Sequence, residues 1–177
     1  MNPVDEFDSK GFSITPVVGA RTFKVDENGW LTGPIYREQR WVDGENVATC
    51  LRHRTPWPTP YFTIGPDGRL ARFEPPVPKE PPPHPLTECR HGFYAYVEGS
   101  NDYHNHGEIF GVIQGYGEVM VGVRGFRCMK ARILALHVKS SVGLERAALI
   151  AGHYPRVPWF DSFEAMVGVF PPDIGVV

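Results

Sequence analysis

The chain has 177 residues with 18 basic and 20 acidic side chains, so its formal net charge is -2. This length suits one ordinary domain that needs no disulfides, and the mixed charges without a basic run argue against duplex DNA as a partner. No stretch approaches the roughly 18 apolar residues of a membrane span. The 19 Gly and 18 Pro residues imply many turns and favour strands over a helical bundle.

The cysteines and the first residues of the chain indicate the cellular compartment of the protein. The three cysteines, Cys50, Cys89 and Cys128, cannot all pair within one chain, which fits a reducing environment where thiols bind metal or stay free. The opening sequence MNPVDEFDSKGFS is acidic, whereas a signal peptide has a basic region followed by an apolar one. We therefore expect a cytoplasmic protein.

The first part of the chain predicts an arm followed by a hairpin. Residues 1–15 show neither helical nor strand period, so we expect a flexible or loosely docked arm. Alternation over residues 20–25, followed by turn residues at 26–29, indicates a hairpin that extends to Trp41. A further turn then places Cys50 near the end of an ordered element.

A proline-rich insertion is predicted over residues 55–85. The run from Pro75 to Pro85 holds 7 prolines in 11 positions, so it can neither continue a helix nor donate to a sheet. We expect an extended, polyproline-like connector. Within it, residues 61–64 and 70–73 flank a Gly-Pro-Asp-Gly turn and predict a small hairpin.

Strong strand signals follow the insertion. They lie at residues 93–97, 109–113, 117–123 and 130–138, and glycine-rich turns separate them. Closely spaced strands of this kind are typical of an antiparallel sheet or a partly open barrel.

Two short helices are predicted near the C-terminus, within residues 141–170. Ser141 is placed to cap a helix in which Leu144, Ala148 and Ala151 share one face. Asp161-Ser-Phe-Glu164 resembles a capping box and starts the second helix. The expected fold is therefore α+β and mainly β, a single domain over residues 16–177.

A cluster of metal-binding residue types lies at the end of the insertion. His84-Pro-Leu-Thr-Glu-Cys89-Arg-His91 places three zinc donors within eight residues, and Cys50 lies upstream. Structural zinc sites take four N or S ligands from the protein, which leaves no open position for water. The alternative is that the two cysteines are buried apolar thiols and the two histidines are ordinary ones.

The residues around this cluster carry a resemblance. The string from His84 through Cys89-Arg-His91-Gly-Phe-Tyr-Ala-Tyr96, preceded by Trp41 and Cys50, resembles a family of uncharacterised proteins from actinobacteria and their phages. Similarity continues through residues 111–133. The resemblance implies Cys50, His84, Cys89 and His91 as ligands of a structural Zn²⁺ that stabilises the fold. His91 stands where the family usually has a second cysteine, an exchange that zinc tolerates. The resemblance implies no activity for this chain.

Other candidate residues have weaker patterns. His104-Asn-His106-Gly-Glu108 is similar to the metal grip of cupins but lacks the longer gap and the second histidine motif, so a polar loop is the simpler interpretation. Cys128 has a basic neighbour and no nearby histidine, which favours a buried structural thiol. Arg124, Arg127 and Arg132 are candidates for a positive stripe on one sheet face or for its solvated side.

The first functional hypothesis is a non-catalytic, zinc-stabilised binding protein. No Walker loop, GxGxxG, GxSxG, HExxH or CxxC motif occurs in the sequence. Polyproline segments lose little entropy on docking, and Trp57, Tyr61 and Phe62 are possible anchors within the insertion. Together with the resemblance, this suggests a phage-encoded protein that engages a host protein in the host-cell cytoplasm.

Two alternatives remain open at this point. In a zinc hydrolase, three of the four candidates would bind the metal, water would take the fourth place, and Glu88 or Glu108 would act as general base. In a nucleic-acid-binding protein, the arginine stripe would contact phosphates and the affinity would fall steeply with salt. The overall acidity argues against the second of these.

Overall fold

The computed structural model describes residues 16–34, 39–50, 85–88, 91–97 and 106–174, and the backbone alone of residues 11–12, 61–64 and 70–73. The chain divides into two compact units. The main unit comprises Met1–Thr49 and Pro85–Val177, and the inserted unit comprises Cys50–His84. The inserted unit overlaps residues 55–85, the segment that the sequence set apart as a proline-rich insertion.

The predicted N-terminal hairpin is present. Strand β2 (Val17–Val25) pairs antiparallel with the short strand β3 (Leu31–Thr32). Between them, Gly29 has a φ of 86°, a left-handed conformation that favours glycine. Gly11–Phe12, within the segment expected to be an arm, form β1 and pair with a later strand.

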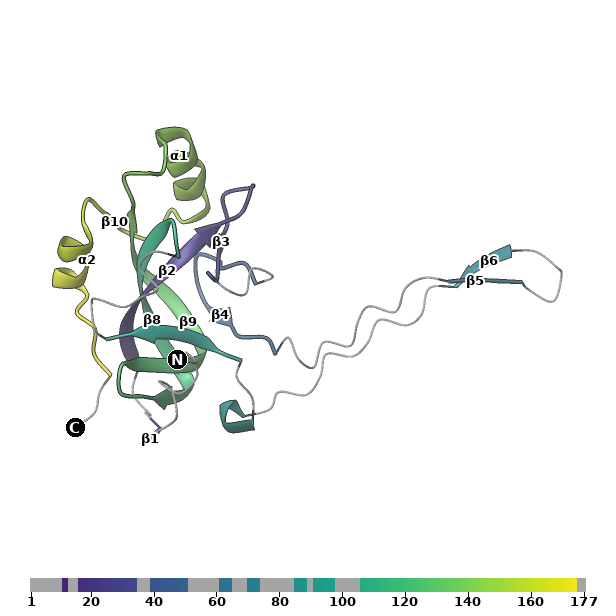
Figure 1. The fold of residues 1–177 in the computed structure, drawn as a ribbon, viewed down its shortest axis with the longest axis horizontal. Coiled ribbons are helices and arrows are strands. Elements are labelled where there is room, and N and C mark those ends of the chain that lie inside the picture. The colour runs from purple at the N-terminus through teal and green to yellow at the C-terminus, as the bar shows by residue number, and fades with distance from the viewer. Residues whose placement is uncertain are drawn as a thin grey trace. The chain divides into compact units, whose positions relative to one another are not determined.

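Four strands of the main unit close into a ring of pairings, and Figure 1 shows where the longer strands of the main unit lie. Strand β8 (Ile109–Val121) pairs with both β2 and β9 (Gly125–Val138). Strand β7 (Phe93–Tyr96) pairs with β9 along its length and with β2 at Ala20. The ring is therefore barrel-like, as one of the two sequence-based expectations had it.

The glycine-rich stretch within β8 is an irregularity and not the predicted turn. Residues 109–113 and 117–123 were expected to be separate strands, yet β8 runs without a break from Ile109 to Val121. Its register with β9 shifts between Tyr116 and Val119, next to Gly117 with a φ of 77°. A bulge of this kind bends a long strand without ending it. The single strand β8 can therefore pair with both β2 and β9.

The sheet is mixed, which corrects the expectation of a purely antiparallel one. Strand β10 (Trp159–Phe160) runs parallel to β9 at Leu136 and His137. A parallel neighbour needs a connection of a dozen or more residues, and helix α1 (Leu144–His153) lies in that connection. At another edge, β4 (Asn46–Val47) pairs antiparallel with β9.

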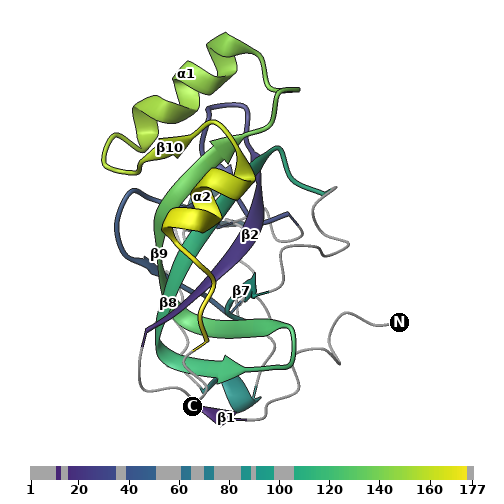
Figure 2. The same cartoon turned by 90° about the vertical axis from the view of Figure 1, so that its left-hand side faces the viewer.

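The two predicted helices are present and pack differently. Figure 2 shows α2 (Phe163–Val169) lying across the strands of the sheet, where Met166 is buried against Val112 and Ala135. Helix α1 stands at one end of the main unit and buries only Ile150. Leu144, which the sequence placed on a shared apolar face, is 89% exposed.

The barrel interior forms the main core. Its largest members are aromatic and aliphatic side chains that β2, β7, β8 and β9 direct inward, joined by Trp41 and Tyr154. The ring of Trp41 lies 4.3 Å from that of Phe93 and 5.1 Å from that of Phe23, centroid to centroid. Contacts of this kind contribute beyond the apolar area that they bury.

The inserted unit contains the predicted small hairpin. Strand β5 (Tyr61–Ile64) pairs antiparallel with β6 (Leu70–Phe73) in a continuous register. In the main unit, the 3-10 helix η3 (Leu86–Glu88) follows directly after the insertion. Among the described residues, no helix has the length and apolar character needed to cross a membrane.

Candidate functional site

The two segments that flank the inserted unit are both fixed on strand β9. Before the insertion, the Ala48 N–H donates to the Met129 carbonyl at 2.8 Å. After it, Arg127 Nη2 donates to the Leu86 carbonyl at 3.0 Å. Because Arg127 and Met129 are two residues apart on one strand, these anchor points on β9 lie within about 7 Å of each other.

Arg127 is the central residue of this anchor. It is 7% exposed, and its Nη2 lies 2.8 Å from the Met120 sulfur as well as near Leu86. Leu86 is fully buried, and its N–H donates to Glu118 Oε1 at 2.9 Å. A Cβ at Gly92, whose φ is 126°, would lie 2.7 Å from Arg127 Cγ. Glycine at this position therefore leaves room for the arginine.

Two of the four predicted zinc ligands belong to the described residues. Cys50 and His91 are both partly buried, and His91 Nε2 lies 3.0 Å from Met129 Sδ. His84 and Cys89 lie outside the described residues. Within the described part of the chain, no three His, Cys, Asp or Glu side chains are grouped so that they could hold a metal ion, and the four-ligand zinc site stays a prediction.

The predicted partner-binding residues are distributed over both units. Trp57 lies outside the described residues, and Tyr61 and Phe62 lie on β5, of which only the backbone is described. Arg132 is exposed and Arg124 is partly buried, whereas Arg127 is buried at the anchor. The arginines therefore do not form one exposed stripe, because Arg127 is buried at the anchor whereas Arg132 is exposed.

The remaining residues that the sequence singled out are Cys128, His104 and His106. Cys128 is fully buried, and burial raises the pKa of its thiol to about 12. This agrees with the interpretation of Cys128 as a structural thiol. His106 is exposed, and His104 lies outside the described residues.

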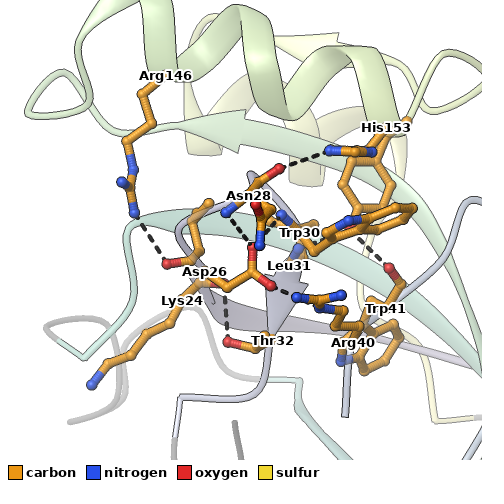
Figure 3. Close-up of polar contacts among 12 residues, drawn as sticks. Lys24, Asp26, Asn28, Trp30, Leu31, Thr32, Arg40, Trp41, Arg146 and His153 are labelled. Carbon is orange, nitrogen blue, oxygen red and sulfur yellow. Dashed lines mark hydrogen bonds and ion pairs between the residues drawn. The ribbon is translucent and has the colours of Figure 1, made fainter. Parts of the chain in front are cut away.

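A second polar cluster joins the β2–β3 turn to helix α1 (Figure 3). Asp26 Oδ1 accepts from the N–H groups of Asn28 and Trp30 at 2.9 Å each, and Arg40 Nε donates to Oδ2 at 2.7 Å. Burial acts to raise the pKa of Asp26, but these hydrogen bonds outweigh it and hold the pKa below its usual value. Asp26 therefore organises the turn as a carboxylate.

The helix side of this cluster contributes His153 and Arg146. The His153 ring stacks on Trp30 at 3.9 Å between centroids, and its Nε2 donates to the Asn28 carbonyl at 2.9 Å. Arg146 Nη2 donates to the Val25 carbonyl and to Glu108, each at 3.0 Å. These contacts fix an otherwise exposed helix on the hairpin, so we interpret the cluster as structural.

The sequence singled out Arg127 only as a member of a positive stripe, and no pattern indicated the other anchor residues. Leu86, Glu118 and Met129 have no spacing that distinguishes them from other apolar or acidic residues. A buried arginine is detectable in principle, because Arg127 is adjacent to Phe126 and Cys128 in a strongly apolar strand. Its partners, however, lie 41 residues away at Leu86 and 33 residues away at Tyr94.

No protein-family model matches this chain, and neither a curated protein nor a solved structure matches it. The function proposed below therefore draws on the sequence patterns and on the geometry of the described residues.

Proposed function

We propose that this protein is a non-catalytic, zinc-stabilised binding protein that engages a macromolecular partner through the inserted unit. The observation that carries the proposal is the double anchor on β9, where Ala48 is bonded to Met129 and Leu86 to the side chain of Arg127, two residues away on the same strand. If the resemblance to phage proteins holds, the partner is a host-cell protein.

The anchor favours binding for an entropic reason. A segment that is attached at both ends and rich in proline has less conformational freedom to lose on association than a free tail. The inserted unit has both properties, and its hairpin backbone is paired along four residues of each strand. Trp57, Tyr61 and Phe62 supply aromatic side chains of the kind that is enriched at binding interfaces.

The zinc part of the proposal concerns the chain next to the anchor. Cys50 follows Ala48 by two residues, and His84 precedes Leu86 by two. Cys89 and His91 follow Leu86 closely, and His91 contacts Met129 within the main unit. The main unit thus holds sequence neighbours of all four predicted ligands on a short part of β9, which supports a structural Zn²⁺ at the base of the insertion.

The binding proposal is tested by replacing the insertion with a flexible linker. We suggest affinity capture from an actinobacterial lysate with the full chain and with a variant in which residues 51–83 are replaced by a flexible linker of about six residues. A second variant carries Trp57→Ala, Tyr61→Ala and Phe62→Ala together. Both variants are expected to lose the proteins that the full chain captures.

The control variant is Val123→Ala, which removes a 65% exposed side chain of the main unit and is expected to capture the same proteins as the full chain. Urea unfolding of each variant shows whether the main unit still folds cooperatively. Capture of the same proteins by the full chain and by the folded linker variant would contradict the proposal.

A further inference from the structure

Strand β2 directs one charged side chain into the barrel interior. Alternate residues of this strand face the main core, where Val17 and Phe23 are fully buried and Val25 is 8% exposed. Arg21 occupies the same face, between Gly19 and Phe23. Strand alternation assigns an apolar residue to such a position, so a guanidinium there needs an explanation.

The guanidinium of Arg21 lies in a corner made by two aromatic rings. Its Cζ is 4.5 Å from the ring centroid of Trp41 and 4.8 Å from that of Phe23. Nε and Nη1 have no contact with solvent and no hydrogen-bond acceptor among the described residues. The residue as a whole keeps partial exposure.

The charge of Arg21 has no described counter-ion. The ionisable groups that act on it are the Cys128 thiol and the Tyr96 phenol, and no carboxylate of the described residues is among them. Burial lowers the pKa of Arg21 to about 10, so the side chain still carries its charge at neutral pH. Buried charges are normally paired because desolvation is costly, and cation–π contacts offset only part of that cost.

We propose that Arg21 is the recognition group of a binding site for a small oxyanion, a carboxylate or a phosphate. Guanidinium N–H groups are the preferred protein donors for both anions. The flanking rings of Trp41 and Phe23 exclude water and thereby strengthen a charge-assisted hydrogen bond. This site is separate from the inserted unit and does not depend on the function proposed above.

The test compares thermal unfolding in sodium phosphate, sodium acetate and sodium chloride at pH 7 and matched ionic strength. Binding to the folded state raises the unfolding temperature. For a chain of this size we expect a rise of about 3 °C or more in at least one of the oxyanions relative to chloride. The phosphate and acetate samples show which oxyanion the site prefers.

Two variants separate binding from general salt effects, since phosphate also stabilises proteins by exclusion from their surface. Arg21→Met is expected to show a smaller difference between oxyanion and chloride than the wild-type chain, and Arg132→Met, which removes an exposed arginine of β9, is expected to keep the wild-type difference. An Arg21→Met variant that responds like the wild-type chain would overturn the proposal, as would equal unfolding temperatures of the wild-type chain in all three salts.

A measurement on the wild-type chain covers the case in which Arg21→Met does not fold. The Nε–H resonance of Arg21, assigned by its loss in Arg21→Lys, is expected to shift and saturate as phosphate or acetate is added. A resonance that does not move in either titration would count against the site.

Discussion

Tyr154 shows how one hydroxyl joins distant parts of the core. It is fully buried, accepts the Leu31 N–H and donates to the Trp41 carbonyl, both at 2.8 Å. We expect Tyr154→Phe to lower the free energy of unfolding by about 1–3 kcal/mol, because two buried backbone groups lose their partner. Tyr116→Phe, which removes an exposed bond to Glu45, is the control and is expected to cost less than about 0.5 kcal/mol. Equal losses measured by urea unfolding would contradict this account.

Cys128 predicts a pH dependence of stability. In the unfolded chain its thiol titrates near its ordinary value of 9.0, whereas burial raises the pKa in the folded state to about 12. The unfolded state therefore releases the proton first, and stability falls as the pH rises from about 9 toward 12. Between pH 8 and pH 10 the expected loss of stability from this group is on the order of 1 kcal/mol. Urea midpoints should fall less over this range in Cys128→Ala than in the wild-type chain, and an identical fall would show that Cys128 is not responsible.

At the scale of elements, the two helices differ in how they begin. Ser162 caps α2, and its hydroxyl accepts the Ala165 N–H at 3.0 Å. Helix α1 has Gly143 at its N-cap without a side-chain bond, so Ser141 does not have the capping role that the sequence predicted. We expect Ser162→Ala to cost about 1 kcal/mol and Ser141→Ala less than about 0.5 kcal/mol in urea unfolding. A larger effect at Ser141 would be inconsistent with these helix boundaries.

At the scale of the whole molecule, the proposed zinc would join the insertion to the rest of the fold. We expect one zinc per chain by elemental analysis, and loss of both the metal and cooperative unfolding in Cys50→Ser. The control is Cys128→Ala, because this third cysteine is buried in the barrel and its loss should leave the zinc content unchanged. Zinc-free wild-type protein would refute the proposal, and a folded Cys50→Ser variant whose zinc exchanges freely with small anions would favour the hydrolase alternative.

The sequence by itself determined the features that depend on neighbouring residues. The hairpin turning at Gly29, the small hairpin of residues 61–73 and the start of α2 within Asp161–Glu164 were predicted, because turn chemistry, strand alternation and capping act within a few residues. The N-cap of α2 is Ser162 and not Asp161, the first residue of the expected capping box. The change in composition that marks residues 55–85 is also local, and that segment overlaps the compact unit Cys50–His84.

Tertiary structure alone decided what depends on partners far apart in the chain. The continuous β8, the parallel β10 and the choice between an open sheet and a ring of strands follow from pairings across the sheet, to which local propensity is insensitive. Likewise, Arg127 fixes Leu86, and Arg21 enters the aromatic corner of Trp41. A side chain's role in the interior is set by which distant residues the fold brings against it, and a sequence pattern records only its neighbours along the chain.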